Sequence, residues 1–174
     1  ITLEKSSIAE DLLDAMTRAS GALPGGLGLA VCIVGMLLAA STGIVGATVV
    51  TMGLMSLPTM LKAGYHPSLA TGTICATGTL GQIIPPSIAL VLLGDVIASA
   101  YQQAQLSAGI FNPRSISVGD LFAGAIIPGF TLVILYSLLI IFIATIRPGL
   151  APATKLPAIK LSRLFLSAVP PILL

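Results

Sequence analysis

Charged residues are scarce in this chain. They make up 8% of its 174 residues, while hydrophobic residues make up 56%. Soluble domains carry about 25% charged residues, so the scarcity excludes a soluble globular domain. The composition and the long uncharged runs predict an all-α integral membrane protein. The net charge of +2 does not indicate a nucleic-acid partner, because the basic residues are scattered along the chain.

Residues that hold metals or perform catalysis are also few. Cys32 and Cys75 lie alone in apolar stretches, where cysteine acts as a small hydrophobe. His66 is the only histidine and stands beside Pro67 in a short loop. No acid lies deep in an apolar run, as a carboxylate-based proton pump would require, and no Ser/His pair or acid pair suits a membrane protease. We therefore expect neither an enzyme nor a bound cofactor.

The most informative feature present is an uncharged run between Arg18 and Lys62, which includes residues 27–60. One bilayer crossing takes about 20 apolar residues, so this run is too long for one crossing and short for two. Ser41-Thr42-Gly43 interrupts it near its middle. We predict a re-entrant helical hairpin over residues 21–63 with its tip near Thr42. Irregular backbone at that depth is tolerated where it is buried in protein or lines a wet cavity, so the tip is a candidate binding site.

A second uncharged run covers residues 68–94 and is interrupted by Gly78-Thr79-Leu80-Gly81-Gln82-Ile83-Ile84-Pro85-Pro86-Ser87. Two adjacent prolines remove two backbone donors and prevent a regular helix through that point. The pattern predicts a broken transmembrane helix whose two halves meet near mid-membrane.

The rest of the chain completes this layout. We expect an amphipathic interfacial helix over 1–20, an extracytoplasmic loop with a short helix over 95–118, a transmembrane helix over 119–147, a cytoplasmic loop over 148–163 and the start of a truncated segment over 164–174. The ends of the chain suggest a fragment of a longer protein. With the hairpin, every Lys and Arg except Arg114 faces one side, as the positive-inside rule prefers. Two full crossings would satisfy that rule equally.

The two interruptions supply the candidate functional residues. A hairpin tip facing a broken helix suits a transporter, because half-helix amino ends attract anionic groups and freed carbonyls bind Na⁺. The candidate ion- and substrate-binding residues are Ser41, Thr42, Gly43, Thr48, Gly78, Thr79, Gly81, Pro86 and Ser87. We expect Na⁺ at Ser41, Gly43, Gly78 and Gly81, largely through backbone carbonyls that lack helical partners. The alternative is that these small and hydroxyl residues serve only helix packing.

Several of these segments resemble one family. They are Ala39 to Thr48, Leu57 to Tyr65, Ala70-Thr71-Gly72, Gly78 to Ser87, Ile116 to Phe122 and Pro128-Gly129. Together they are similar to the large membrane subunit, or permease, of tripartite ATP-independent periplasmic (TRAP) transporters. The stretch Tyr101 to Asn112 resembles the branch labelled mannitol/chloroaromatic. At the tip, Ile44 and Val45 follow Gly43, where many relatives carry further serines.

The resemblance implies an inverted-repeat elevator transporter in the bacterial inner membrane, of which this chain holds the first repeat. It implies symport of an organic acid with sodium, a small membrane subunit as partner, and a periplasmic substrate-binding protein that delivers the carboxylate. The hairpin tip and the broken helix would form half of the ion and substrate site. The rival hypothesis is a scaffold or assembly subunit that transports nothing.

Overall fold

The computed structural model describes residues 13, 17, 23–110, 112 and 117–153, and within them every regular element is a helix. The elements are α3 (Gly26–Thr42), α4 (Val45–Lys62), α5 (Pro67–Thr79), the short 3-10 helix η1 (Leu80–Gln82), α6 (Ile88–Ser107) and α7 (Val118–Ile146). The expected all-α fold is therefore confirmed for this part of the chain. Most of the interfacial helix predicted over 1–20 and all of 164–174 lie outside the described residues.

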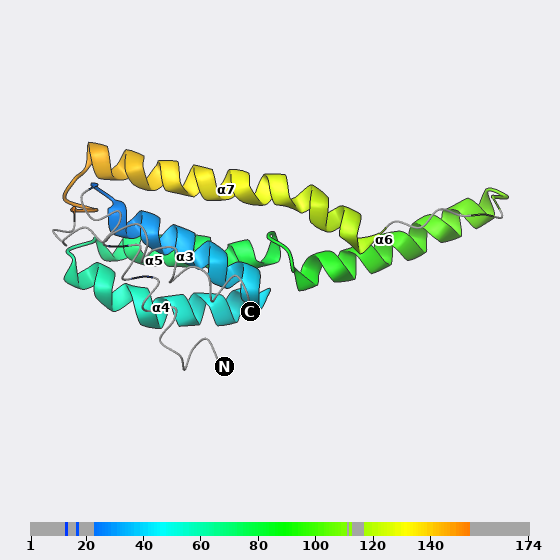
Figure 1. Cartoon of the computed structure of the whole chain (residues 1–174), viewed down its shortest axis with the longest axis horizontal. Helices are drawn as coiled ribbons and strands as arrows, with labels where there is room; N and C mark the ends of the chain where they lie inside the picture. The colour runs from blue at the N-terminus through cyan, green and yellow to red at the C-terminus, as the bar shows by residue number, and fades with distance from the viewer. Residues whose placement is uncertain (1–12, 14–16, 18–22, 111, 113–116, 154–174) are drawn as a thin grey trace, which may run out of the picture.

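Helices α3, α4 and α5 form a bundle, and α7 lies along α3 on another side (Figure 1). Helix α3 is the central element and contacts α4, α5, η1 and α7. Its apolar side chains, among them Leu27, Val31, Val34 and Leu38, are buried in the main core cluster. The buried residues of α3 are not confined to one face, as expected for a helix that neighbours enclose.

Small residues allow α3 to approach its neighbours closely. A Cβ built on Gly28 would lie 2.9 Å from Ile140 of α7, and one built on Gly35 would lie 2.9 Å from Thr77 of α5. Side chains at these two positions would push the helices apart, so the glycines set the spacing of the bundle.

The end of the bundle opposite the α3–α4 junction is closed by hydrogen bonds between segments that are distant in sequence. The backbone N–H of Gly25 donates to Ala151 O (3.2 Å), and that of His66 donates to Leu150 O (3.0 Å). Tyr65, in the turn between α4 and α5, accepts a bond from the Gly28 N–H at 3.2 Å and so caps α3. Burial raises the pKa of the Tyr65 phenol.

The region predicted as a hairpin is a pair of antiparallel helices. Helices α3 and α4 contain 17 and 18 residues, and only Gly43 and Ile44 separate them. By length and composition, α4 and α7 are the two described helices long and apolar enough to cross a membrane, whereas α3 is slightly shorter. The re-entrant course of this pair through a bilayer stays a prediction.

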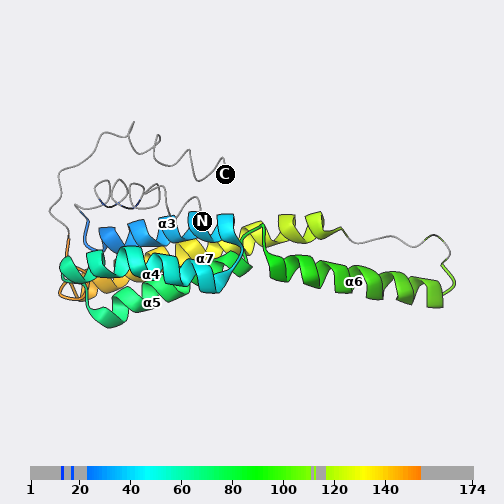
Figure 2. The same ribbon diagram turned by 90° about the horizontal axis from the view of Figure 1, so that it is seen from below.

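The segment predicted as a loop with a short helix over 95–118 is helical in its first part. Helix α6 continues through Asp95 to Ser107, because residues 88–107 contain no proline and are rich in good helix formers. Gly94, where a boundary was expected, instead lies inside α6 at a close contact with Val118 of α7. Figure 2 shows α6 running beyond the bundle, accompanied at first by the amino end of α7.

Candidate functional site

The tip of the α3–α4 pair is a tight turn built on one glycine. Gly43 is the C-cap of α3 with φ 61°, a left-handed conformation that glycine adopts without strain, and its N–H donates to Ala39 O at 3.0 Å. Ile44 is extended, and α4 begins at the next residue without a side-chain cap. The irregular part of the tip is therefore a two-residue link, Gly43 and Ile44, while Ser41 and Thr42 are the last residues of α3.

The hydroxyl groups at the tip are bonded within the pair. Thr42 Oγ1 lies 2.6 Å from Thr48 Oγ1, which joins the end of α3 to the first turns of α4. The buried Thr48 also donates to Ile44 O at 2.9 Å, and Ser41 Oγ donates to Leu38 O at 2.8 Å. Ser41 and Thr42 are exposed, whereas Gly43 is buried.

The second interruption separates α5 from α6. Helix α5 ends at Thr79 and passes into η1; after η1 the chain leaves helical geometry until α6, and the Pro85–Pro86 peptide bond is cis. Ser87 is buried and caps α6: its Oγ accepts the Leu90 N–H at 3.3 Å and donates to Gln82 O at 2.7 Å. The diproline therefore prevents the α5–η1 helix from continuing, and Ser87 caps the start of α6.

The fold brings these two interruptions into contact. A Cβ on Gly43 would lie 2.6 Å from Pro86 O, and one on Gly81 would lie 3.2 Å from Ala39 O. Gln82 Nε2 donates to Gly43 O at 3.1 Å, which links the tip directly to η1. The predicted residues Gly43, Gly81, Pro86 and Ser87 thus belong to one junction, which we call the tip–break junction.

Other predicted residues lie differently. Gly78 packs directly against the Val49 side chain of α4, so it serves helix contact. Thr79 is exposed, and its hydroxyl donates to Ala76 O of its own helix at 2.7 Å. Gln82 was missed as a site residue, although a polar side chain inside an apolar, glycine-rich break is a signal that could have identified it.

The carbonyls of this region are better paired than expected. The Gly43 carbonyl accepts from Gln82, and the Gly78 carbonyl accepts from the Leu80 N–H. The Gly43 carbonyl thus has a side-chain partner in place of a helical one, the Gly78 carbonyl has a backbone donor at the tightened end of α5, and their binding of a cation stays a prediction. A carbonyl oxygen has two lone pairs, so each can still accept a second partner.

Helix ends dominate the electrostatics of the junction. The sequence has no Asp, Glu, Lys or Arg between Leu23 and Leu61 or between Ala63 and Gly94. The carboxyl ends of α3 and η1 meet the amino ends of α4 and α6 here. Carboxyl ends carry partial negative charge and amino ends partial positive charge, so the junction combines helix ends of both signs.

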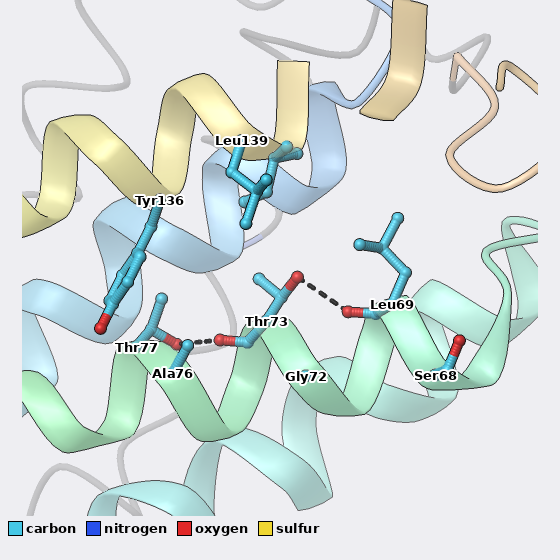
Figure 3. A pocket seen from close by; sticks show the side chains of 9 residues that line it. Ser68, Leu69, Gly72, Thr73, Ala76, Thr77, Tyr136 and Leu139 are labelled. Atoms are coloured by element: carbon cyan, nitrogen blue, oxygen red, sulfur yellow. Dashed lines mark hydrogen bonds between the residues drawn. The ribbon is translucent and has the colours of Figure 1, made fainter. Parts of the chain in front are cut away.

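The structure also contains an apolar hollow away from this junction. It measures about 230 Å³ and lies between α5 and α7 (Figure 3). The hydroxyls of Thr73 and Thr77 in its wall donate to Leu69 O and Thr73 O of their own helix, each at 2.8 Å. None of the predicted site residues lines it. Within the described part of the chain, no group of three or more His, Cys, Asp or Glu could hold a metal ion.

Comparison with known proteins identifies the family. The family model described as "Tripartite ATP-independent periplasmic transporter, DctM component" matches residues 1–174. The chain is 32% identical over 151 residues to the C4-dicarboxylate TRAP transporter large permease protein of Pseudomonas aeruginosa, covering 87% of this chain and 30% of that protein. It is 36% identical over 135 residues to the protein of that name from Rhodobacter capsulatus, covering 75% of this chain and 29% of the relative.

A more distant relative carries a different substrate name. The ectoine TRAP transporter large permease protein of Halomonas elongata is 26% identical over 145 residues, covering 83% of this chain and 30% of that protein. No solved structure matches the chain. The chain spans about 30% of the length of the first two relatives. It belongs to the DctM family, the large membrane permease component of TRAP transporters, which are transport proteins and not enzymes.

Proposed function

We propose that this chain forms half of the ion and substrate site of a sodium-coupled secondary transporter in the bacterial inner membrane. The complete transporter imports an organic acid delivered by a periplasmic substrate-binding protein and includes a small membrane subunit. The tip–break junction is the single observation that carries the proposal. In it, two polar interruptions from separate apolar runs meet in one place.

The cation is proposed to bind where α3 and η1 end. Sodium prefers oxygen ligands, and the last carbonyls of a helix lack intrahelical partners. The hydroxyl of Ser41 and the carbonyls of Gly43 and Gly81 are the ligands we propose here. Gly78 is the weakest of the predicted ligands, since its carbonyl already accepts a backbone bond and its Cα faces Val49.

The carboxylate of the substrate is proposed to bind at the opposite pole of the junction. Helix α4 begins without a side-chain cap, and α6 begins at Ile88, after its N-cap Ser87 and Pro86. Amides at helix amino ends bind anions, because their N–H groups point outward and the helix dipole is positive there. Relatives named for C4-dicarboxylates make an organic acid the first substrate class to test. The resemblance of Tyr101 to Asn112 to the mannitol/chloroaromatic branch stays a prediction.

The rival hypothesis, a scaffold that transports nothing, has one observation in its favour. The hydroxyls of Ser41, Thr42 and Thr48 are all bonded within the α3–α4 pair, as packing residues would be. The scaffold hypothesis does not account for the contact between the tip and the diproline break. Two helices can pack through apolar surface without two irregular backbone segments at one depth.

Uptake measurements separate the two hypotheses. A complete transporter that contains this chain is reconstituted in proteoliposomes, and its binding protein is added outside with labelled C4-dicarboxylates and related acids. We expect uptake that needs both the binding protein and an inward Na⁺ gradient. An equal K⁺ gradient should not replace the Na⁺ gradient. Sodium-dependent binding-protein-driven uptake excludes the scaffold hypothesis, and uptake that ignores Na⁺ contradicts the proposed coupling.

A further inference from the structure

Gln82 connects the two interruptions through both its side chain and its backbone. Its Nε2 donates to Gly43 O at 3.1 Å, across 39 positions of sequence, and its backbone O accepts from Ser87 Oγ at 2.7 Å. Ser87 Oγ in turn accepts the Leu90 N–H in the first turn of α6. These bonds form a continuous path from the tip of the α3–α4 pair to the amino end of α6.

Few polar side chains at the tip are placed to bond to the break. The residues that follow Gly43 are Ile44 and Val45, whose side chains have no hydrogen-bonding groups. Thr42 and Thr48 bond to each other and to their own helices, so they hold α3 to α4 and not the tip to the break. Among the described residues, the side-chain hydrogen bond that joins the tip to the η1–α6 segment is the one from Gln82 to Gly43 O.

We propose that Gln82 is the positioning residue that fixes the tip against the diproline break and so couples cation binding at the tip to anion binding at α6. This proposal rests on the sodium-coupled function proposed above. In the chain of bonds, the Gly43 carbonyl keeps one lone pair for a cation while the other accepts the Gln82 amide. The amide thus holds that carbonyl in place before the cation binds. Cation binding that orders the tip also orders the amino end of α6, because Ser87 bonds to both Gln82 and Leu90.

The proposed coupling role of Gln82 has measurable consequences that a role in packing alone would not have. Coupling between two ligands is reciprocal: sodium should tighten the binding of the acid by the same factor as the acid tightens the binding of sodium. Loss of the Gln82 bond should reduce that factor and should leave the maximal rate at saturating Na⁺ and substrate nearly unchanged. A residue that only supports the fold would instead lower the maximal rate or the yield of folded protein.

The test compares Gln82→Met with Gln102→Met in the complete transporter. Methionine keeps the length of glutamine without its hydrogen bonds, and Gln102 is exposed on the distal part of α6. We expect Gln82→Met to raise the Na⁺ concentration for half-maximal uptake about fivefold, the effect of one lost hydrogen bond. It should also weaken the dependence of substrate half-saturation on Na⁺. Gln102→Met should match the parent in both. Equal behaviour of the two variants overturns the proposal.

Hydrogen exchange tests the link without transport. In Na⁺-free buffer, the hydrogen-bonded tip amides of Gly43 and Thr48, which donate to Ala39 O and Ile44 O, should exchange about fivefold faster in Gln82→Met than in Gln102→Met. Suppose that Gln82→Met exchanges faster but uptake by the parent transporter does not depend on Na⁺. The hydrogen-bond link between Gln82 and the tip would then stand, whereas the sodium-coupled function and the part of Gln82 in cation binding would be refuted. Unchanged exchange in a transporter that is sodium-dependent would overturn the link alone.

A second variant covers the case in which Gln82→Met does not fold. The carboxyl of Gln82→Glu can donate to Gly43 O when protonated and cannot when ionised. Relative to Gln102→Glu, the protection of the Gly43 and Thr48 amides should therefore fall as pH rises through the titration of the new carboxyl. Protection that does not change with pH relative to that control counts against the link.

Discussion

At the scale of single residues, glycines decide how closely the helices of this protein meet. A Cβ at Gly43 would collide with Pro86 O, and one at Gly78 would collide with Val49, whereas one at Gly53 or Gly72 would meet nothing within 4 Å. The sequence shows all four glycines alike. Only the tertiary arrangement distinguishes the glycines at helix contacts from the glycines with open space around them. A glycine of the second kind therefore serves as the matched control for a substitution at one of the first kind.

Gly78→Ala should destabilise the protein, because the new methyl group overlaps Val49 in a packed α4–α5 contact. Overpacking of this kind costs about 1–3 kcal/mol. Gly72→Ala, in the same helix with open space around it, should be neutral or stabilising by about 0.5–1 kcal/mol. Thermal unfolding of the purified transporter in detergent measures both.

The double variant Gly78→Ala/Val49→Ala gives the decisive comparison for this contact. Removing the Val49 methyl groups makes room for the new Cβ, so part of the lost stability should return. If Gly78→Ala is as stable as Gly72→Ala, the close approach of α5 to α4 is wrong.

At the scale of helices, the positions of glycine and proline predicted the helix ends better than the positions of polar residues did. The break between α3 and α4 falls at Gly43, within the predicted tip, and the Pro85–Pro86 pair does end a helix line. Both features follow from local backbone preferences, which a sequence displays directly. The sequence did not predict how far α6 extends. The glutamines of residues 102–105 were interpreted as part of a loop with a short helix, although glutamine is a good helix former.

The bond between Gln82 and Gly43 could not be predicted in the same way. It joins residues 39 positions apart and depends on the packing of η1 against the last turn of α3. Nothing in the local sequence of either segment specifies its partner. For the same reason, the sequence did not reveal the donors to the Gly43 and Gly78 carbonyls. Nor did it show that the Thr79 hydroxyl donates to Ala76 O of its own helix.

The helix lengths support the re-entrant course proposed for α3 and α4. At 1.5 Å per residue, α7 is about 43 Å long, whereas α3 is about 26 Å, short of a hydrocarbon core of about 30 Å, and α4 is about 27 Å, at the lower limit for a crossing. The free ends of the pair lie together at one end of the bundle (Figure 1). We therefore expect Leu23 and Lys62, both exposed, to face the same side of the membrane.

Labelling of single cysteines measures this topology. With Cys32 and Cys75 replaced by alanine and serine, Leu23→Cys and Lys62→Cys should react with a membrane-impermeant maleimide from the same side. Ala108→Cys, just beyond the far end of α6, should react from the opposite side. Reaction of Leu23→Cys and Lys62→Cys from opposite sides would show that the pair crosses the membrane an odd number of times, and the re-entrant course would be wrong.

At the scale of the whole molecule, the tip–break junction lies between two differently built halves. On one side is the bundle of α3, α4 and α5 with its closed end; on the other, α6 extends away with the first part of α7 (Figures 1 and 2). The described part of α6 has one buried residue, Gly94, so its surface is open to lipid or to other parts of a transporter. The irregular backbone that we assign to ions and substrate is thus placed midway along the molecule.

Sodium titration of uptake by glycine variants tests the central claim most directly. Gly43→Ala forces a left-handed conformation on alanine, a strain of about 1–2 kcal/mol, and moves the tip away from Pro86. In proteoliposomes with the binding protein present, it should raise the Na⁺ requirement about tenfold, since tenfold corresponds to about 1.4 kcal/mol. Gly81→Ala should have a smaller effect in the same direction, because its Cβ meets Ala39 O at 3.2 Å. Gly53→Ala should match the parent. A Na⁺ dependence that is unchanged in both Gly43→Ala and Gly81→Ala would contradict a cation site at the tip–break junction.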